Sequence, residues 1–355
     1  MRAVVVAPGT RDSLSLVDVQ VPVPTQNQVL LKVVRVGICG TDRDIISAFY
    51  GLAPAGSNFL TLGHESLCRV ASLGSPVDGL KEGDLVVPTV RRNCPENCLN
   101  CANGESDMCI TGHYREHGIK QLNGFAAEFA VSDSSFVVKI PESLSKTGVL
   151  LEPLTIVEKG IQQALRIQQN RMKWEPKNVL VFGAGPVGII ATAILRLRGF
   201  NVDTVATRSK DSEKAKLVES TGAHYIDAKE TPINLMKQDY DMVFEITGNP
   251  KVASEAHKLL NLNGILCYLG IYREDLETEN VGRQFTDIVL GNKTLFGSVN
   301  ANRSYFVSGA SDLLDISNRW PGLLERMITR VYSPDQYKLA YAAEDRESIK
   351  TVIEF

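Results

Sequence analysis

Four cysteines lie close together in one short polar stretch of the sequence. Cys94, Cys98, Cys101 and Cys109 fall within CPENCLNCANGESDMC, which has little apolar mass to hold it in one conformation. Four thiolates around a zinc ion would supply the missing order through tetrahedral coordination. Disulfides are the alternative, but the chain opens on MRAVVVAPGT without a hydrophobic signal segment, which favours a reducing compartment and free thiols. The spacing therefore predicts a structural zinc lobe at about 93–110.

A glycine-rich motif follows the apolar run at 178–182 and opens an apolar, helix-like run. It consists of Gly183, Ala184, Gly185, Pro186, Val187 and Gly188. The three glycines suit a tight turn, a close approach of backbone to a pyrophosphate, and close packing of helix on strand. The diphosphate would lie at the helix N-terminus, where free N–H groups favour anions. The alternative is a glycine turn without a ligand.

The end of the next strand-like run bears on the choice of cofactor. An NAD site usually has an acid there, whereas this run ends in Thr207, Arg208, Ser209 and Lys210, and Asp203 lies too early. A 2′-phosphate would find a guanidinium and two hydroxyls at this point. The residues favour NADP, although such ends can accept NAD as well, and Arg208 could also be a solvated surface charge.

A third group of residues could hold a catalytic metal. Cys39 lies in the glycine-flanked run GICGTD, and His64 and Glu65 follow in LGHE. Of the other cysteines outside the lobe, Cys68 and Cys267 lie in apolar runs typical of a packed core. A catalytic zinc needs about three protein ligands and an open position. We therefore predict Cys39, His64 and Glu65 as ligands.

The elements that must position these residues change in character near residue 155. Before it, short β-type runs broken by Pro and Gly predict a β-rich domain over 1–155. From Lys177 onward strand-like and helix-like runs alternate, which predicts a doubly wound parallel sheet over 156–302. The tail over about 303–355 is expected to complete the first domain. The fold class is therefore α/β.

Composition excludes several kinds of partner. The 355 residues carry a formal net charge of −3, so no global basic field attracts nucleic acid. We see no apolar run long enough to cross a bilayer. We expect a cytoplasmic protein with a small-molecule substrate and neither a nucleic-acid nor a membrane partner.

Six stretches resemble the zinc-dependent medium-chain dehydrogenase/reductase superfamily over the whole chain and in the expected order. They are GICGTD, LGHE, KEGDLVVP, the four-cysteine segment, LLEPL and VFGAGPVG. GICGTDRDI, FLTLGHE, KEGDLVVPTVRR and LFGSVN are most similar to the archaeal-type glucose dehydrogenases. The resemblance implies a GroES-like N-terminal domain, a Rossmann domain, and a homotetramer or homodimer. It also implies oxidation of an aldose at C1 to the aldonolactone, with hydride transfer to NAD(P)⁺.

The resemblance also assigns site residues. It implies that Glu152 is the fourth group at the zinc held by Cys39, His64 and Glu65, either directly or through water. Thr41 matches a hydroxyl near nicotinamide and substrate. Residues matching those that hydrogen-bond the sugar are Glu116 and Asn300. Residues matching those that line the nicotinamide are Gly270, Ile271, Tyr272, Ser298, Val299 and Asn300.

Two positions depart from the glucose-enzyme pattern. Val90 is apolar where the glucose enzymes often have Asn, and Ile156 is apolar where they often have Asp or Asn. In those enzymes both side chains help to hold sugar hydroxyls. Fewer polar partners give less selective recognition, so a pentose, a deoxysugar or another polyol stays open. The rival functions are an alditol or secondary-alcohol dehydrogenase and a non-catalytic NADP-binding protein of the same fold.

Overall fold

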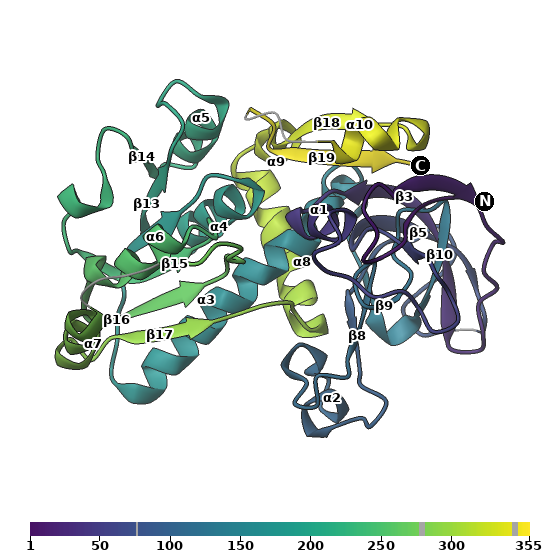
Figure 1. Cartoon of the computed structure of the whole chain (residues 1–355), viewed down its shortest axis with the longest axis horizontal. Helices are drawn as coiled ribbons and strands as arrows, with labels where there is room; N and C mark the ends of the chain where they lie inside the picture. Colours follow the sequence, from purple (N-terminus) through teal and green to yellow (C-terminus); the bar gives the residue numbers. More distant parts are fainter. Residues whose placement is uncertain (76, 277–280, 343–346) are drawn as a thin grey trace. The chain divides into compact units, whose positions relative to one another are not determined.

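The computed structural model describes residues 1–75, 77–276, 281–342 and 347–355 (Figure 1). Contacts divide the chain into two compact units. The first comprises Met1–Thr155, Asn300–Leu314 and Leu324–Phe355, and the second comprises Ile156–Val299 and Asp315–Leu323. This division differs from the expected boundaries in two places, because 300–302 belongs to the first unit and 315–323 to the second. One helix, α8 (Arg303–Arg319), contributes residues to both units.

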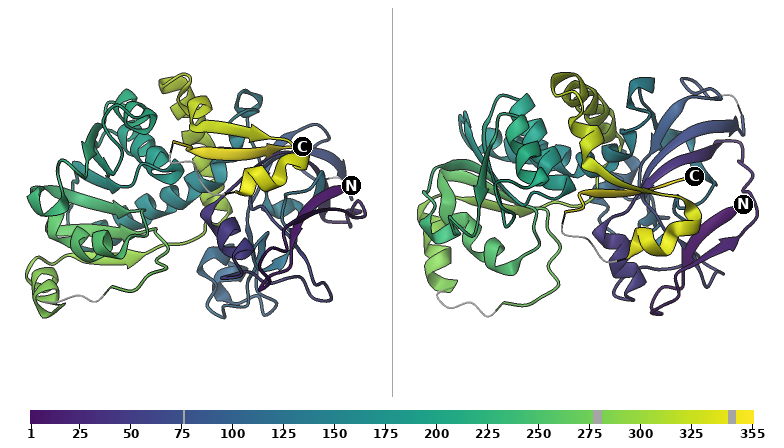
Figure 2. Two further views of the ribbon diagram at one scale, coloured as in Figure 1. Left: turned by 45° about the horizontal axis from the view of Figure 1, so that its top comes forward. Right: turned by 90° about the horizontal axis from the view of Figure 1, so that it is seen from above.

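The first unit is built mainly from antiparallel strands. Its largest sheet has the order β11-β6-β5-β3-β19-β18, with β10 also paired to β3; smaller sheets have the orders β2-β1-β4 and β7-β8-β9. Near the C-terminus, β18 and β19 run side by side in parallel (Figure 2). The strand bounds are β1 Arg2–Val6, β2 Ser15–Asp18, β3 Gln28–Gly37, β4 Leu60–Thr61, β5 Glu65–Leu73, β6 Leu85–Pro88, β7 Arg91–Arg92, β8 Arg115–His117, β9 Gln121–Leu122, β10 Phe129–Asp133, β11 Val137–Lys139, β18 Ile328–Tyr332 and β19 Lys350–Glu354.

The second unit contains a six-stranded parallel sheet of order β14-β13-β12-β15-β16-β17. Its strands are β12 Asn178–Phe182, β13 Asn201–Ala206, β14 His224–Asp227, β15 Tyr240–Glu245, β16 Leu260–Tyr268 and β17 Thr294–Gly297. The order reverses between β12 and β15, as in doubly wound dinucleotide-binding sheets. Leu180, Val243 and Leu266 fill a core cluster of this unit. The sheet confirms the predicted α/β class.

Helices connect and cover these strands. The α-helices are α1 Gly40–Ile46, α2 Leu99–Ala102, α3 Leu151–Arg171, α4 Pro186–Leu197, α5 Glu213–Ser220, α6 Pro250–Glu255, α7 Val281–Leu290, α8 Arg303–Arg319, α9 Leu323–Met327 and α10 Tyr337–Tyr341. Short 3-10 turns occur at η1 Ser106–Met108, η2 Ser134–Phe136, η3 Glu142–Leu144, η4 Gly148–Leu150, η5 Ile233–Leu235, η6 Ala256–Leu259 and η7 Pro334–Gln336. In the second unit, α4 packs on β12 and β13 and is buried along most of its length, which explains its apolar sequence.

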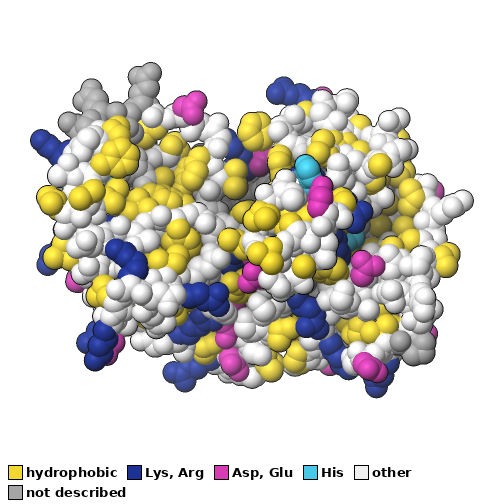
Figure 3. All heavy atoms as spheres, turned by 90° about the horizontal axis from the view of Figure 1, so that it is seen from below, with side chains coloured by type: hydrophobic (Ala, Val, Ile, Leu, Met, Phe, Trp, Pro, Cys, Tyr) yellow, Lys and Arg dark blue, Asp and Glu magenta, His cyan; other side chains and the backbone are white. Residues whose placement is uncertain are grey.

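The surface carries charge of both signs. On the face shown in Figure 3, lysine and arginine side chains are interspersed with aspartate and glutamate. Within the described residues, no helix combines the length and apolar character needed to span a bilayer.

A matched pair of glycine substitutions tests the turn between β12 and α4. A Cβ on Gly188 would lie 1.9 Å from the backbone oxygen of Gly183, whereas a Cβ on Gly185 would meet nothing within 4 Å. Because backbone cannot rotate out of the way, Gly188→Ala should cost about 1–3 kcal/mol, as overpacking does. Gly185→Ala should cost less than about 1 kcal/mol, because it replaces a favoured N-cap residue without a clash. Thermal unfolding of both variants checks this, and equal losses would contradict the clash.

Candidate functional site

The candidate catalytic metal centre lies where the end of β3 is paired with the start of its antiparallel neighbour β5. Glu65 opens β5 directly opposite Gly37, the last residue of β3. Cys39 is the N-cap of α1, and His64 precedes Glu65. The ligand atoms of Cys39, His64 and Glu65 all lie within 4.8 Å of one another. The structure thus brings together three predicted residues whose thiolate, imidazole and carboxylate could bind zinc.

Asp42 positions two members of this group. Its Oδ2 accepts the backbone N–H of Cys39 at 2.8 Å, and its Oδ1 lies 3.5 Å from Nδ1 of His64. Burial lowers the pKa of His64, but the charge of the fully buried Asp42 raises it, and the net result lies well above the usual value. A carboxylate beside one ring nitrogen orients the imidazole and leaves the other nitrogen for a metal. Sequence analysis did not single out Asp42, although the motif CGTD contains it.

Lys350 is a second residue that the sequence did not reveal. Its Nζ is ion-paired with Oε2 of Glu65 and donates to the backbone oxygen of Ile38 at 3.1 Å. Both charged side chains are at most 3% exposed. Burial lowers the pKa of Lys350, but nearby negative charge, Glu65 foremost, raises it above the usual value. Gly37 permits this approach, since a Cβ there would collide with both side chains.

Glu152 and Thr41 lie beside the group without belonging to it. Glu152 is in the first turn of α3 and is buried, and burial raises its pKa to about 7 despite the opposing charge of His64. It is not among the residues whose ligand atoms cluster within 4.8 Å. The Thr41 hydroxyl lies 3.9 Å from Sγ of Cys39. A role for Glu152 as a metal ligand stays a prediction.

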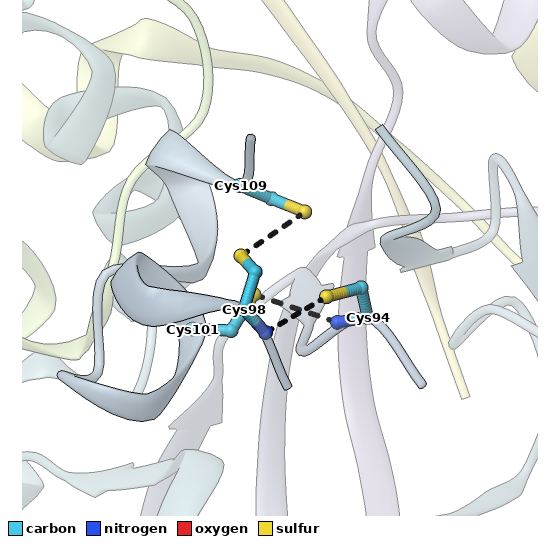
Figure 4. A group of neighbouring side chains, drawn as sticks. All are labelled: Cys94, Cys98, Cys101 and Cys109. Carbon is cyan, nitrogen blue, oxygen red and sulfur yellow. Dashed lines mark hydrogen bonds between the residues drawn. The ribbon is translucent and has the colours of Figure 1, made fainter. Parts of the chain in front are cut away.

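The four predicted lobe cysteines form a second group. The sulfur atoms of Cys94, Cys98, Cys101 and Cys109 lie within 4.8 Å of one another and point to a common centre (Figure 4). Backbone N–H groups support them, since Cys94 donates to Cys101 Sγ at 3.5 Å and Cys98 to Cys94 Sγ at 3.3 Å. All four thiols are free, so the set fits a closed tetrahedral metal site.

The electrostatics of the lobe differ from thiol to thiol. Burial raises the pKa of Cys109, yet hydrogen bonds from Thr111 and from the backbone of Gly112 outweigh it and lower that pKa to about 6. Burial raises the pKa of Cys101 to about 12. Cys109 therefore offers a thiolate more readily than Cys101, and a metal would have to displace the proton of Cys101.

The two residues predicted to bind sugar are in direct contact. The Nδ2 of Asn300 donates to Oε1 of Glu116 at 2.9 Å, and both residues are buried. Arg91, which the sequence did not reveal, pairs with the same oxygen through Nη2 at 2.9 Å. Strand register explains this pair, because Arg91 on β7 lies opposite Glu116 on β8. Val90, beside Arg91, is only 1% exposed.

The glycine-rich turn lies between β12 and α4, as its motif predicted. Gly183 has φ of 112°, a conformation that L side chains rarely adopt. Gly185 is the N-cap of α4 and Pro186 its first residue. Because the first N–H groups of a helix lack internal partners, the start of α4 could bind a phosphate.

The predicted 2′-phosphate residues follow β13, which ends at Ala206. Thr207 and Ser209 are exposed and Arg208 is half-buried. Lys210 is ion-paired with Glu230 at 3.1 Å, whereas Arg208 forms no ion pair with any described residue. Arg208 is therefore the cation available to an added phosphate.

The segments predicted to line the nicotinamide follow adjacent parallel strands. Gly270, Ile271 and Tyr272 come after β16, and Ser298, Val299 and Asn300 come after β17. The Tyr272 hydroxyl donates to Glu245, a buried carboxylate at the end of β15. The Nζ of Lys159 donates to the backbone oxygen of Val299 at 3.0 Å. Glu245 and Lys159 are buried charges that the sequence analysis did not identify.

Comparisons with known proteins match both parts of the chain. A family model described as "Glucose dehydrogenase C-terminus" matches residues 145–355, and "Alcohol dehydrogenase GroES-like domain" matches residues 25–142. The chain belongs to the glucose dehydrogenase family. It is therefore a member of the medium-chain dehydrogenase/reductase superfamily with a GroES-like N-terminal domain, which confirms the resemblance found in the sequence.

Full-length relatives support the same placement. Glucose 1-dehydrogenase of Methanocella arvoryzae is 43% identical over 359 residues, and glucose 1-dehydrogenase 1 of Caldivirga maquilingensis is 45% identical over 354. Each match covers 100% of this chain and 99% of the relative. A solved structure of Haloferax mediterranei glucose dehydrogenase, in complex with NADP, Zn and gluconolactone, aligns with a TM-score of 0.90 at 31% identity. That alignment covers 100% of this chain and 99% of the other.

Removal of the buried ammonium should destabilise the metal-free protein. Lys350→Met leaves the Glu65 carboxylate buried without its cation, which should cost about 3–5 kcal/mol. Lys216→Met is the matched control, because Lys216 pairs with Glu213 on the surface of α5, where a pair contributes about 0–1 kcal/mol. Denaturant unfolding after chelation measures both losses. Equal, small losses would show that the Lys350 pair is not held in the protein interior.

Proposed function

We propose that this protein oxidises the C1 hydroxyl of a cyclic aldose, glucose or a similar sugar, to the aldonolactone. The hydride passes from C1 to the nicotinamide of NADP⁺, with NAD⁺ as a second acceptor, and a proton is released. The observation that carries the proposal is the group of Cys39, His64 and Glu65, in a chain whose full-length relatives are glucose 1-dehydrogenases.

The three clustered residues would hold the catalytic zinc. Their sulfur, nitrogen and oxygen donors fit zinc, and three protein ligands leave a position for substrate. When bound, the ion acts as a Lewis acid and lowers the pKa of the hydroxyl that it contacts. Asp42 orients His64, and Lys350 fixes Glu65. Glu152 would be the fourth group, either through water or as a direct ligand that gives way to the substrate. The Thr41 hydroxyl would accept a hydrogen bond from the reacting oxygen and pass its proton toward water.

The lobe would hold a second, structural zinc. Its Cys94, Cys98, Cys101 and Cys109 provide four sulfur donors and no open position, which is typical of sites that stabilise a fold. The remaining roles are binding ones. Glu116 and Asn300 would hydrogen-bond sugar hydroxyls. The turn from Gly183 to Gly188 would bind the diphosphate, and Thr207, Arg208 and Ser209 the 2′-phosphate.

A second candidate function is oxidation of an alditol or a secondary alcohol by the same machinery. The buried, apolar Val90 and the apolar Ile156 favour the secondary alcohol, which has fewer hydroxyls than an aldose, because neither side chain can satisfy a substrate hydroxyl. A site that hydrogen-bonds a substrate hydroxyl strongly rejects analogues without it, because its own polar groups are then left unpaired, whereas an apolar contact discriminates weakly. A substrate with fewer hydroxyls is therefore compatible with Val90 and Ile156.

We also propose that the protein works in the cytoplasm as a homotetramer or homodimer. The free thiols of all seven cysteines suit a reducing compartment. The assembly is carried over from the family resemblance, and light scattering of the purified protein would distinguish the tetramer from the dimer and from a monomer.

Removal of the catalytic metal ligands tests the main proposal. Zinc-loaded protein should reduce NADP⁺ with one or more aldoses and contain two zinc ions per chain. Cys39→Ala should contain one zinc and lose at least about 10³-fold in kcat, since a Lewis acid supplies several kcal/mol. Its affinity for NADPH, followed by fluorescence, should stay unchanged. Elemental analysis and a panel of aldoses, alditols and alcohols check this; full activity of Cys39→Ala would refute the assignment.

A second substitution tests cofactor choice. Arg208→Ala removes the available cation, so the KM for NADP⁺ should rise roughly 10–100-fold, the value of about 1.5–3 kcal/mol for a charged hydrogen bond. The KM for NAD⁺ should change less than about twofold, because NAD⁺ carries no 2′-phosphate. Lys210→Ala is the control, since that lysine already pairs with Glu230. An equal effect on both cofactors would argue against 2′-phosphate recognition by Arg208.

A further inference from the structure

We infer that the four-cysteine lobe helps to position the sugar-binding residue Glu116, and that Arg91 is the positioning residue that connects Glu116 to the lobe. The inference rests on the proposed function only in naming Glu116 as a sugar-binding group. The coupling between the lobe and Glu116 follows from contacts within the first unit.

The hydrogen bonds of Glu116 are unevenly distributed between its two oxygens. Oε1 accepts from Nε of Arg91 at 3.0 Å and from Nδ2 of Asn300 at 2.9 Å, and it lies 2.9 Å from Nη2 of Arg91. Oε2 accepts no hydrogen bond from the described residues. The side chain is only 5% exposed, so the carboxylate is fixed and one oxygen is kept for an incoming donor, such as a substrate hydroxyl.

The same guanidinium reaches into the lobe. Nη1 of Arg91 donates to the backbone oxygen of Asp107 at 2.9 Å, and the guanidinium carbon lies 3.6 Å from the centre of the Tyr114 ring. A guanidinium is planar and rigid, so Nη1 cannot move without moving Nε and Nη2. The position of the Asp107 carbonyl therefore constrains the position of the Glu116 carboxylate.

A second contact joins the lobe to the other donor. Oδ1 of Asp107 accepts from Nδ2 of Asn302 at 3.0 Å, and Asn302 follows Asn300 by two residues. Asp107 and Asn302 are both buried. Thus one lobe residue contacts Arg91 directly, and it also holds the short segment that presents Asn300 to Glu116.

The order of Asp107 depends on the cysteines. Asp107 lies in η1 and precedes Cys109 by two residues. The lobe's large apolar side chains give it little core, since Leu99 is 71% exposed and Ile110 is 70% exposed. Four-thiolate coordination would therefore supply much of the order, as in small metal-stabilised folds. Loss of the lobe metal should release Asp107 and with it the carboxylate of Glu116.

The adjacent arginine provides a matched control. Arg92 is buried like Arg91, but it donates to Ser132 and to the oxygens of Thr89, and its guanidinium lies over Phe136. Its Nη1 also donates to the backbone oxygen of Arg91 at 3.2 Å, but among the described residues its side chain forms no hydrogen bond or ion pair with Glu116 or Asp107. Arg92→Met therefore reproduces the loss of a buried guanidinium without cutting the link to the lobe.

The test compares Arg91→Met, Arg91→Lys and Arg92→Met in the zinc-loaded protein. Arg91→Met should raise the sugar KM roughly 10–100-fold, the cost of losing a charged hydrogen bond, while kcat and the NADPH affinity change less than about threefold. Arg91→Lys should recover part of the loss, because an ammonium keeps the charge but cannot reach both partners. Arg92→Met should leave the sugar KM near the parent value.

A readout independent of turnover separates this inference from the proposed function. Coupling is reciprocal, so Arg91→Met should speed zinc release from the lobe by severalfold relative to Arg92→Met, as measured with a colorimetric chelator. If the parent oxidises no aldose, the proposed function fails and zinc release still decides the coupling. Equal release rates and equal sugar KM values in the two methionine variants would overturn the inference.

Asn302→Asp tests the second contact if Arg91→Met does not fold. The change keeps the Oδ1 atom that accepts from Ser304 at the start of α8, and it removes the amide that donates to Asp107. It should raise the sugar KM and speed release of the lobe zinc in the same direction as Arg91→Met. Parent-like values for both would count against the link.

Discussion

The absence of a side chain at Gly37 is the constraint on which the candidate catalytic centre depends. At this point β3 has β5 on one side and β19 on the other. The Glu65 carboxylate and the Lys350 ammonium meet over the glycine, where any Cβ would collide with them. A buried charge without a partner is costly, so the pair and the glycine require one another. The geometry of Glu65 as a candidate ligand follows from this meeting of three strands.

A buried pair of a cation and a carboxylate also occurs at the candidate sugar site. In each case a buried cation fixes one oxygen of a buried carboxylate: Lys350 pairs with Glu65, and Arg91 pairs with Glu116. The choice of cation differs with the task. A single ammonium suits one oxygen beside a metal, whereas the guanidinium fork of Arg91 also reaches the carbonyl of Asp107. If the two carboxylates bind ligands as proposed, they would do so without rearrangement, which lowers the cost of binding.

Local patterns in the sequence predicted the parts of the site whose residues are neighbours in the chain. The four cysteines, like the turn from Gly183 to Gly188, lie within one short segment. The spacing of such residues in the sequence therefore limits directly how they can lie in space. We predicted Cys39 because the other cysteines are accounted for and glycines flank it, and His64 and Glu65 because LGHE places an imidazole beside a carboxylate. The roles given to Glu116, Asn300 and Glu152 came only from family resemblance, since an isolated acid or amide in a sequence has no periodicity that marks it as functional.

The sequence by itself determined the α/β class, the order of the two kinds of sheet, and the composition of both candidate metal centres, because residue type and short spacing suffice for these. Only the tertiary structure decided which polar and charged side chains meet. Lys350 reaches Glu65 across 285 positions of sequence, and Asn300 reaches Glu116 across 184. The first pair depends on strand register and on which strands become neighbours, and the second on where the segment after β17 lies. Both result from burial of the whole core rather than from any local pattern.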